Sequence, residues 1–237
     1  MRQIVQLVSC LLLCAIIQPL QAATVPSRIN VAYDVLKGKL KIATITETFI
    51  RSQDHYSLES VSDAVGLLAL FKPETIRVTS EGTLTQAGLR PAVFSSKRKI
   101  DSERNNRAEF DWVTKRISLY EGNGKRTLPL PADTQDRLSA MYQFLFLKLS
   151  DTTTLDFHMT NGIKLDIYNY LVTTGPRVSV PLGEFRTLYV ASVPEAGASK
   201  TEIWLATEHA NFPCKMTITD ADGGQLTQVL TRFDAMP

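Results

Sequence analysis

One stretch near the middle of the chain reads Asp133-Thr-Gln-Asp-Arg-Leu-Ser-Ala-Met-Tyr-Gln-Phe-Leu-Phe-Leu-Lys148, and it determines how the fold is interpreted. Five apolar side chains in and just after it recur at helical spacing and therefore share one helix face: Leu138, Met141, Tyr142, Leu145 and Leu149. Asp133 is placed to cap the first turn, Asp136 adds negative charge there, and Lys148 lies in the last turn. Phe144, Phe146 and Leu147 widen the apolar stripe. We therefore expect a helix over Asp133–Lys148 that other elements surround.

Sequence typical of β-strands lies on both sides of this helix. Leu40–Ile50 is rich in β-branched residues, and Asn161-Gly162 is a two-residue hairpin signal. Gly66–Phe71 is predicted to be a helical turn or an apolar loop. The predicted strands are 29–36, 40–50, 56–61, 76–84, 89–99, 106–113, 116–120, 155–159, 163–172, 178–180, 185–193, 201–206, 214–219 and 226–233.

So many antiparallel strands cannot remain one flat sheet. The predicted fold class is therefore mainly β, with a single curved antiparallel sheet that forms an open or half barrel around one main α-helix. The clearest half-buried strand is 163–172. Its apolar residues Ile163, Leu165, Ile167 and Leu171 share one face, while the other face carries Lys164, Asp166, Tyr168 and Tyr170.

The N-terminus has the pattern of an export signal. Arg2 precedes a largely apolar run from Ile4 to Leu20, and Ala22 and Ala23 follow as small residues suited to cleavage. We expect residues 1–22 to be a signal peptide, residues 23–237 to form a single β-rich domain, and the protein to be periplasmic. The alternative is an uncleaved anchor.

Composition and charge exclude several classes of function. The formal net charge of +2 indicates neither a nucleic-acid-binding protein nor one with an acidic substrate. Nothing after the N-terminus is long and apolar enough for a membrane span. Cys214 would be the only cysteine after cleavage, so an internal disulfide is not expected.

The chain contains no recognisable catalytic or metal-binding pattern. His55, His158 and His209 stand alone, without the spacing of metal ligands, and no Gly-x-Ser-x-Gly elbow is present. Ser96-Lys97-Arg98-Lys99 spells Ser-x-x-Lys, but it falls in a predicted strand rather than at the start of a helix. We therefore expect neither an enzyme nor a cofactor.

The C-terminal half carries a familiar set of segments: Val180-Pro-Leu-Gly-Glu-Phe185, Glu202-Ile-Trp-Leu-Ala206 and Phe212-Pro-Cys-Lys-Met216. Together with Asp136–Tyr142, they resemble a family of exported bacterial proteins catalogued only as a domain of unknown function. The resemblance spans about Tyr33 to Phe233. The same ending resembles the half-barrel of the periplasmic lipoprotein carriers of the Lol system, in which a curved sheet encloses an apolar cavity for acyl chains. This likeness implies a binder of lipid or of another hydrophobic ligand.

The candidate ligand site follows from this interpretation. Acyl chains would lie between the concave sheet and the helix stripe of Leu138, Met141, Tyr142 and Leu145. Trp204 and Tyr168 would line the same cavity, and Leu68 and Phe71 would form an apolar lip. Each of these side chains is equally explained as ordinary core or cross-strand packing. The alternative function is an envelope protein-interaction module with a filled core and no ligand.

The most basic segment is a predicted hairpin tip that carries Lys97, Arg98, Lys99, Arg104 and Arg107, with Asp101 and Glu103 among them. A solvated mixed-charge loop explains it most simply. Its functional interpretation is contact with anionic phospholipid or lipopolysaccharide head groups.

Overall fold

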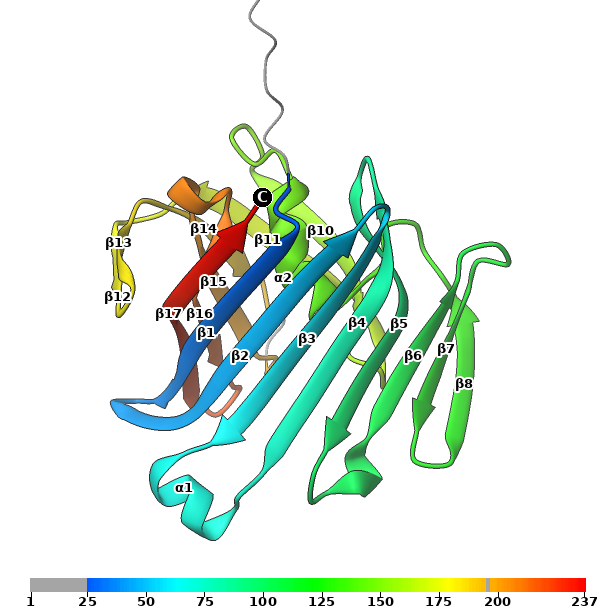
Figure 1. The fold of residues 1–237 in the computed structure, drawn as a ribbon, viewed down its shortest axis with the longest axis horizontal. Coiled ribbons are helices and arrows are strands. Elements are labelled where there is room, and N and C mark those ends of the chain that lie inside the picture. The colour runs from blue at the N-terminus through cyan, green and yellow to red at the C-terminus, as the bar shows by residue number, and fades with distance from the viewer. Residues whose placement is uncertain (1–24, 195–196) are drawn as a thin grey trace, which may run out of the picture.

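The computed structural model describes residues 25–194 and 197–237, and the predicted signal peptide lies outside these residues. One mainly antiparallel sheet of 15 strands dominates it, in the order β8-β7-β6-β5-β4-β3-β2-β1-β17-β16-β15-β14-β11-β10-β9 (Figure 1). The strands are β1 (Arg28–Lys37), β2 (Leu40–Ser52), β3 (His55–Ala64), β4 (Thr75–Thr85), β5 (Gly88–Arg98), β6 (Asn106–Asp111), β7 (Arg116–Glu121), β8 (Gly124–Pro129), β9 (Gln135–Asp136), β10 (Thr154–Thr160), β11 (Leu165–Thr174), β14 (Thr187–Ser192), β15 (Lys200–Ala206), β16 (Phe212–Thr219) and β17 (Gln225–Met236). Strands β12 (Val178–Val180) and β13 (Gly183–Phe185) form a separate small hairpin.

The sheet is strongly curved but not closed. Strands β1 and β17 pair at its centre, which places the first and last strands side by side. The edge strands are β8 and β9, and no pairing joins them among the described residues. Register shifts in β1, β4–β5 and β15–β16 mark bulges, which increase local twist and help such a long sheet to bend. The expectation of a single curved, open antiparallel sheet is confirmed at this level.

The long central helix is not confirmed. The predicted segment Asp133–Lys148 contains strand β9, the short helix α2 (Ser139–Gln143) and a 3-10 turn at Phe144–Phe146. Asp133 has a positive φ of 57°, so it cannot be the helical cap that the sequence suggested. The helical spacing of the apolar residues does correspond to a helix, but that helix begins only at Ser139, because Gln135 and Asp136 pair in parallel with β10.

The core lies on the concave face of the sheet, where the central segment packs. Tyr142 is fully buried between sheet aromatics, at 5.7 Å from the ring of Phe49 and 5.3 Å from that of Phe212. Leu138 and Phe144 are also buried. Figure 1 shows α2 behind the front strands, inside the curve of the sheet. The expectation that other elements surround this segment is therefore met, although the helix itself is short.

Strand β11 buries the face opposite to the apolar one. Tyr170 and Val172 are buried, whereas Ile167 and Leu171 are about half exposed. Tyr170 packs edge-on against Phe157 of β10, and Val172 belongs to the same cluster as Val190. The neighbouring strands thus determine which face turns inward, since both faces of β11 carry bulky side chains.

The remaining helical pieces are short. Helix α1 (Gly66–Phe71) lies beyond the end of β3, and 3-10 turns occur at Ser102–Arg104 and Thr207–His209. Across residues 25–194 and 197–237, the structure contains no helix that is both apolar and long enough to cross a membrane.

Candidate functional site

Asp136 holds the start of α2 against the sheet. Its Oδ1 accepts hydrogen bonds from the backbone N–H groups of Leu138 at 2.9 Å and Ser139 at 2.8 Å, which is the work of a capping side chain. Its Oδ2 accepts a hydrogen bond from Ser80 Oγ of β4 at 2.5 Å. Burial raises the pKa of Asp136 above its usual value, although these hydrogen bonds oppose the shift. Asp136 therefore fixes both the helix start and its position on the sheet.

A second buried carboxylate lies on the sheet and binds a side chain of the central segment. Glu47 of β2 accepts hydrogen bonds from Tyr142 Oη at 3.1 Å and Ser60 Oγ at 3.0 Å. Burial raises the pKa of Glu47 to about 7, against the lowering effect of both hydroxyl donors. Together, Asp136 and Glu47 connect the central segment to the concave face through polar contacts as well as through packing.

Gln143, at the end of α2, forms a third polar connection. Its Oε1 accepts a hydrogen bond from the backbone N–H of Leu89 at 2.8 Å, and its Nε2 donates to the carbonyl of Ala87 at 2.6 Å. Gly88 lies between these two residues with φ +109°, and a Cβ there would lie 2.4 Å from Gln143 Oε1. A glycine is therefore required at this turn, both for its backbone conformation and for the close approach of Gln143.

A pocket opens beside this connection. It has a volume of about 690 Å³ and lies between the β4–β5 turn, the β6–β7 turn, the lead into β9, the end of the α2 segment and β10. Its lining is mainly apolar, with leucines and a phenylalanine from four of these segments: Leu89, Leu130, Leu147, Leu155 and Phe157. A volume of this size is typical of sites for small organic ligands.

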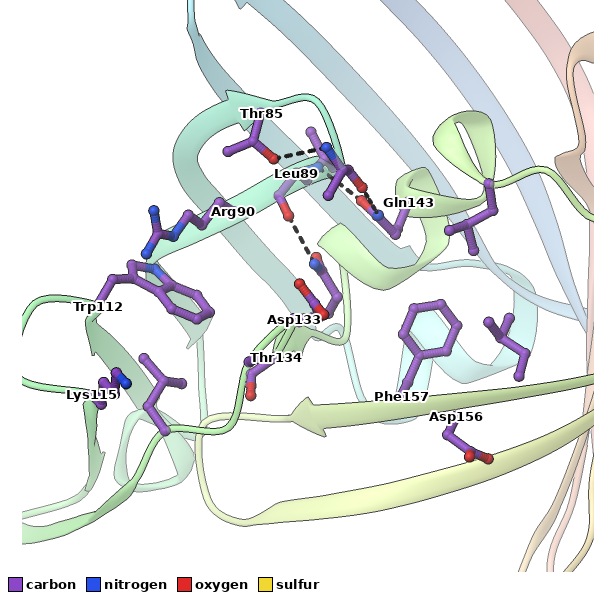
Figure 2. A pocket seen from close by; sticks show the side chains of 16 residues that line it. Thr85, Leu89, Arg90, Trp112, Lys115, Asp133, Thr134, Gln143, Asp156 and Phe157 are labelled. Carbon is purple, nitrogen blue, oxygen red and sulfur yellow. Dashed lines mark hydrogen bonds between the residues drawn. The ribbon is translucent and has the colours of Figure 1, made fainter.

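The pocket has a cationic end and an apolar end. The Arg90 guanidinium lies 4.7 Å from the centroid of the Trp112 ring, and Lys115 lines the same side. Figure 2 shows these three side chains together at one end, and Phe157 projecting toward α2 at the other. Two carboxylates, Asp133 and Asp156, also line the pocket. This arrangement suits a molecule with one polar and one apolar end.

Six of the eight residues that the sequence suggested for a ligand site lie in or against the two core clusters, and two do not. None of the eight lines this pocket. Leu138 and Tyr142 belong to the main core, and Met141 and Leu145 pack against it half buried. Tyr168 lies half buried on β11. The helix face proposed to hold acyl chains is thus occupied by protein side chains.

Of the other three residues, Trp204 also packs against the main core, whereas Leu68 and Phe71 lie apart on α1. Trp204 is half buried on β15, 5.2 Å from the ring of Tyr189, with Lys215 Nζ 4.5 Å from its centroid. Leu68 and Phe71 are on α1, with exposed fractions of 38% and 86%. Their exposure agrees with a lip, but α1 lies at the opposite end of β4 from the pocket (Figure 1).

The residues considered for catalysis stay separate. Ser96 lies in strand β5 and is buried, whereas Lys99 follows the strand and is exposed. Cys214 is buried, and burial raises the pKa of its thiol to about 11. His209 packs between the rings of Phe185 and Phe233, at 5.3 and 4.6 Å. In the part of the chain that the structure describes, no cluster of three or more His, Cys, Asp or Glu side chains is arranged to hold a metal ion.

The fold places the chain in the class of open, β-barrel-like proteins. A crystal structure of a β-barrel-like protein of the domain of unknown function DUF1849, from Brucella abortus, superposes with a TM-score of 0.56 and 12% sequence identity. The match covers 91% of this chain and 100% of the other. At 12% sequence identity, this likeness is evidence for a shared fold alone.

The family itself follows from the sequence. The model of a family described as a protein of unknown function (DUF3108) matches residues 28–231, and the chain belongs to that family. The resemblance to an uncharacterised domain family is thereby confirmed. A comparison with curated proteins finds no match.

Proposed function

We propose that this protein is a non-enzymatic binder of a lipid or similar amphipathic molecule, which it holds in the pocket beside α2. The observation that carries this proposal is the pocket of about 690 Å³, which Leu147, Leu155 and Phe157 help to line and which has Phe157 at one end and Arg90 and Lys115 at the other. An acyl chain would lie against the apolar end, where each buried methylene contributes about 0.8 kcal/mol.

The charges of the pocket favour one type of head group. Arg90 and Lys115 attract a negative charge, while Asp133 and Asp156 oppose the accumulation of more than one. A single carboxylate or a zwitterionic head group therefore fits better than a multiply charged one. Trp112 keeps the Arg90 guanidinium in place by stacking, since the Trp112 Nε1–H is itself fixed by donation to the carbonyl of Pro91 at 2.6 Å.

A titration with a fluorescent long-chain fatty acid tests this site. Leu155→Asp places a charge in the apolar end, and the dissociation constant should rise at least tenfold, which corresponds to about 1.4 kcal/mol. Leu226→Asp is the matched control, because Leu226 is 40% exposed on β17, outside the pocket lining. Equal affinities of the two variants would rule out binding in this pocket.

We also propose that the protein acts in the periplasm of a Gram-negative bacterium, as a factor in envelope maintenance. The support is the signal-type sequence of residues 1–22. Fractionation of cells that express the full chain tests it: the processed protein should be released with the periplasmic contents, and retention of the unprocessed chain in the cytoplasm or inner membrane would contradict it.

The second candidate is a protein-interaction module without a ligand. It is favoured by the burial of Leu138 and Tyr142 in the core and by the exposed edge strand β8. An edge strand presents unpaired backbone groups to a partner strand. This candidate predicts that the purified protein carries no lipid and takes none up.

A further inference from the structure

One end of the sheet carries apolar side chains that no other part of the described chain covers. Helix α1 has no buried residue, and the exposed fractions of Leu67, Leu70 and Phe71 are 63%, 78% and 86%. Leu40 and Ile100 are similarly exposed, at 56% and 59%. We use the name α1 rim for residues 37–41, 66–74 and 99–104. Large apolar groups gathered in water at one end of a protein usually mark a site of interaction.

The three segments of the α1 rim are adjacent in space. The backbone N–H of Val65 donates to the carbonyl of Ile42 at 2.9 Å, which joins α1 to the start of β2. The N–H of Lys99 donates to the carbonyl of Thr75 at 3.0 Å. The N–H of Ile100 donates to Glu74 Oε1 at 3.1 Å. Figure 1 shows the β1–β2 turn, α1 and the β5–β6 connection along one end of the sheet.

Positive charge surrounds the apolar residues. The α1 rim carries the six cations Lys37, Lys39, Lys41, Lys72, Lys99 and Arg104, against the three carboxylates Glu74, Asp101 and Glu103. Lys41 pairs with Asp34 at 2.6 Å and Arg104 with Asp101 at 3.5 Å. Within residues 25–194 and 197–237, the other four cations make no ion pair: Lys37, Lys39, Lys72 and Lys99. The rim therefore combines exposed apolar side chains with four lysines that have no ion pair among the described residues.

We propose that the α1 rim docks the protein on a membrane surface that contains anionic phospholipid. Leu67, Leu70 and Phe71 would enter the boundary between head groups and acyl chains, as apolar residues of interfacial segments do. The lysines would lie level with the phosphates, where each contributes about 1 kcal/mol. The positive charge and the projecting apolar tip together fit a negatively charged, penetrable surface.

This docking surface is separate from the ligand pocket. Strand β4 begins at Thr75, directly after the α1 rim, and ends at Thr85 in the pocket lining, so its length places the two sites on the order of 30 Å apart. A protein docked through the rim would hold the pocket mouth away from the membrane. The inference thus goes beyond the proposed ligand binding, and either can fail without the other.

Flotation with lipid vesicles tests the docking surface. The chain is produced from Ala23, because the apolar residues before it would bind membranes by themselves and the described fold begins at Val25. Vesicles of phosphatidylcholine alone are compared with vesicles that contain 30% phosphatidylglycerol (roughly the anionic share needed for a strong surface potential). Binding is expected only to the anionic vesicles, and it should weaken at high salt.

Variants of exposed residues separate docking from folding. Phe71→Asp should lower the partition coefficient at least tenfold, and the double variant Lys72→Gln, Lys99→Gln roughly 25-fold. Val113→Asp is the matched control, because Val113 is 94% exposed on the β6–β7 turn at the other end of the sheet. Leu155→Asp should bind vesicles normally even if it loses the pocket ligand.

Three outcomes would overturn the proposal. The first is equal binding to neutral and anionic vesicles, and the second is an equal loss in Val113→Asp and Phe71→Asp. The third is the absence of vesicle binding together with a concentration-dependent dimer that Phe71→Asp abolishes, which would assign the rim to a second copy of the chain.

Discussion

Replacing Glu47 by glutamine should change how the stability of the fold depends on pH. In the folded protein, burial raises the pKa of Glu47 from 4.5 to about 7, so the fold binds its proton more tightly than the unfolded chain does. The contribution of this group to stability is therefore fully present below pH 4.5. It is lost progressively as the pH rises toward 7, and the loss is complete above that pH.

The size of the effect follows from the shift. One pKa unit corresponds to 1.36 kcal/mol, so a pKa raised from 4.5 to about 7 makes the free energy of unfolding fall by about 3 kcal/mol between pH 4.5 and pH 8. Glutamine resembles the protonated carboxyl in shape and can still hydrogen-bond the hydroxyls of Ser60 and Tyr142. The Glu47→Gln variant should therefore exceed the wild type by less than about 1 kcal/mol at pH 5 and by about 3 kcal/mol at pH 8.

Urea unfolding at pH 5, 6, 7 and 8, followed by circular dichroism, measures this difference. The neighbouring Tyr33, Tyr142 and Cys214 have raised pKa values because of burial, so they stay neutral throughout this range. Glu59 lies on the next strand and is about half exposed, so Glu59→Gln is the control. Its free energy of unfolding should differ from that of the wild type by the same amount at each pH. Parallel stability curves for the wild type and Glu47→Gln would refute a buried, protonated Glu47.

Three further changes test the local structure. Asp136→Ala leaves three hydrogen-bond donors without their acceptor and should lower the free energy of unfolding by about 3 kcal/mol in the same urea titration. Asp133→Asn keeps a residue tolerant of positive φ and should change the free energy of unfolding by less than about 0.5 kcal/mol. Equal losses in the two variants would show that Asp133 is the helix cap. Gly88→Ala should cost about 1–3 kcal/mol, because its Cβ would collide with Gln143 at a positive φ, and an unchanged melting temperature would contradict that contact. The Cys214 thiol, buried and with a pKa of about 11, should not react with a disulfide reagent at pH 8 until the protein is unfolded, so rapid labelling of the native protein would show that it is accessible.

The strands were predictable because their signals are local. The β-branched run in Leu40–Ile50 and the Asn161-Gly162 turn indicate structure from sequence alone, and the structure has β2 and the β10–β11 hairpin at these places. The open, curved sheet then follows from the number of strands. Which face of β11 is buried was not predictable in this way, because Tyr170 and Leu171 are both bulky and only the neighbouring strands distinguish them.

The central helix shows where a periodic pattern is insufficient. The spacing of Leu138, Met141 and Tyr142 indicated a helix correctly, but its length depended on partners far away in the sequence. Gln135 and Asp136 pair with β10, Gln135 also donates a hydrogen bond to the carbonyl of Leu89, and Asp136 accepts one from Ser80. Because of these contacts, the first residues of the predicted helix are extended instead of helical. The cap at Asp136 rather than Asp133 follows from the same contacts.

The pocket could not be found from the sequence. Its lining comes from separate turns and strands, for example Arg90 after the β4–β5 turn, Trp112 after β6 and Phe157 in β10. None of these residues belongs to a motif with a fixed spacing, since they meet only when the sheet curves and its last strand, β9, reaches β5. The exposed apolar residues of α1, in contrast, were already conspicuous as Gly66–Phe71.

Native mass spectrometry of the protein, purified from the periplasm without detergent and with lipid extraction alongside, tests the proposed ligand binding most directly. The account predicts an additional bound mass in the wild type that extracts as a lipid or fatty acid, retained in Leu226→Asp and lost in Leu155→Asp. A mass that corresponds to the protein alone, and that stays so after incubation with phospholipid and fatty acid, would contradict it.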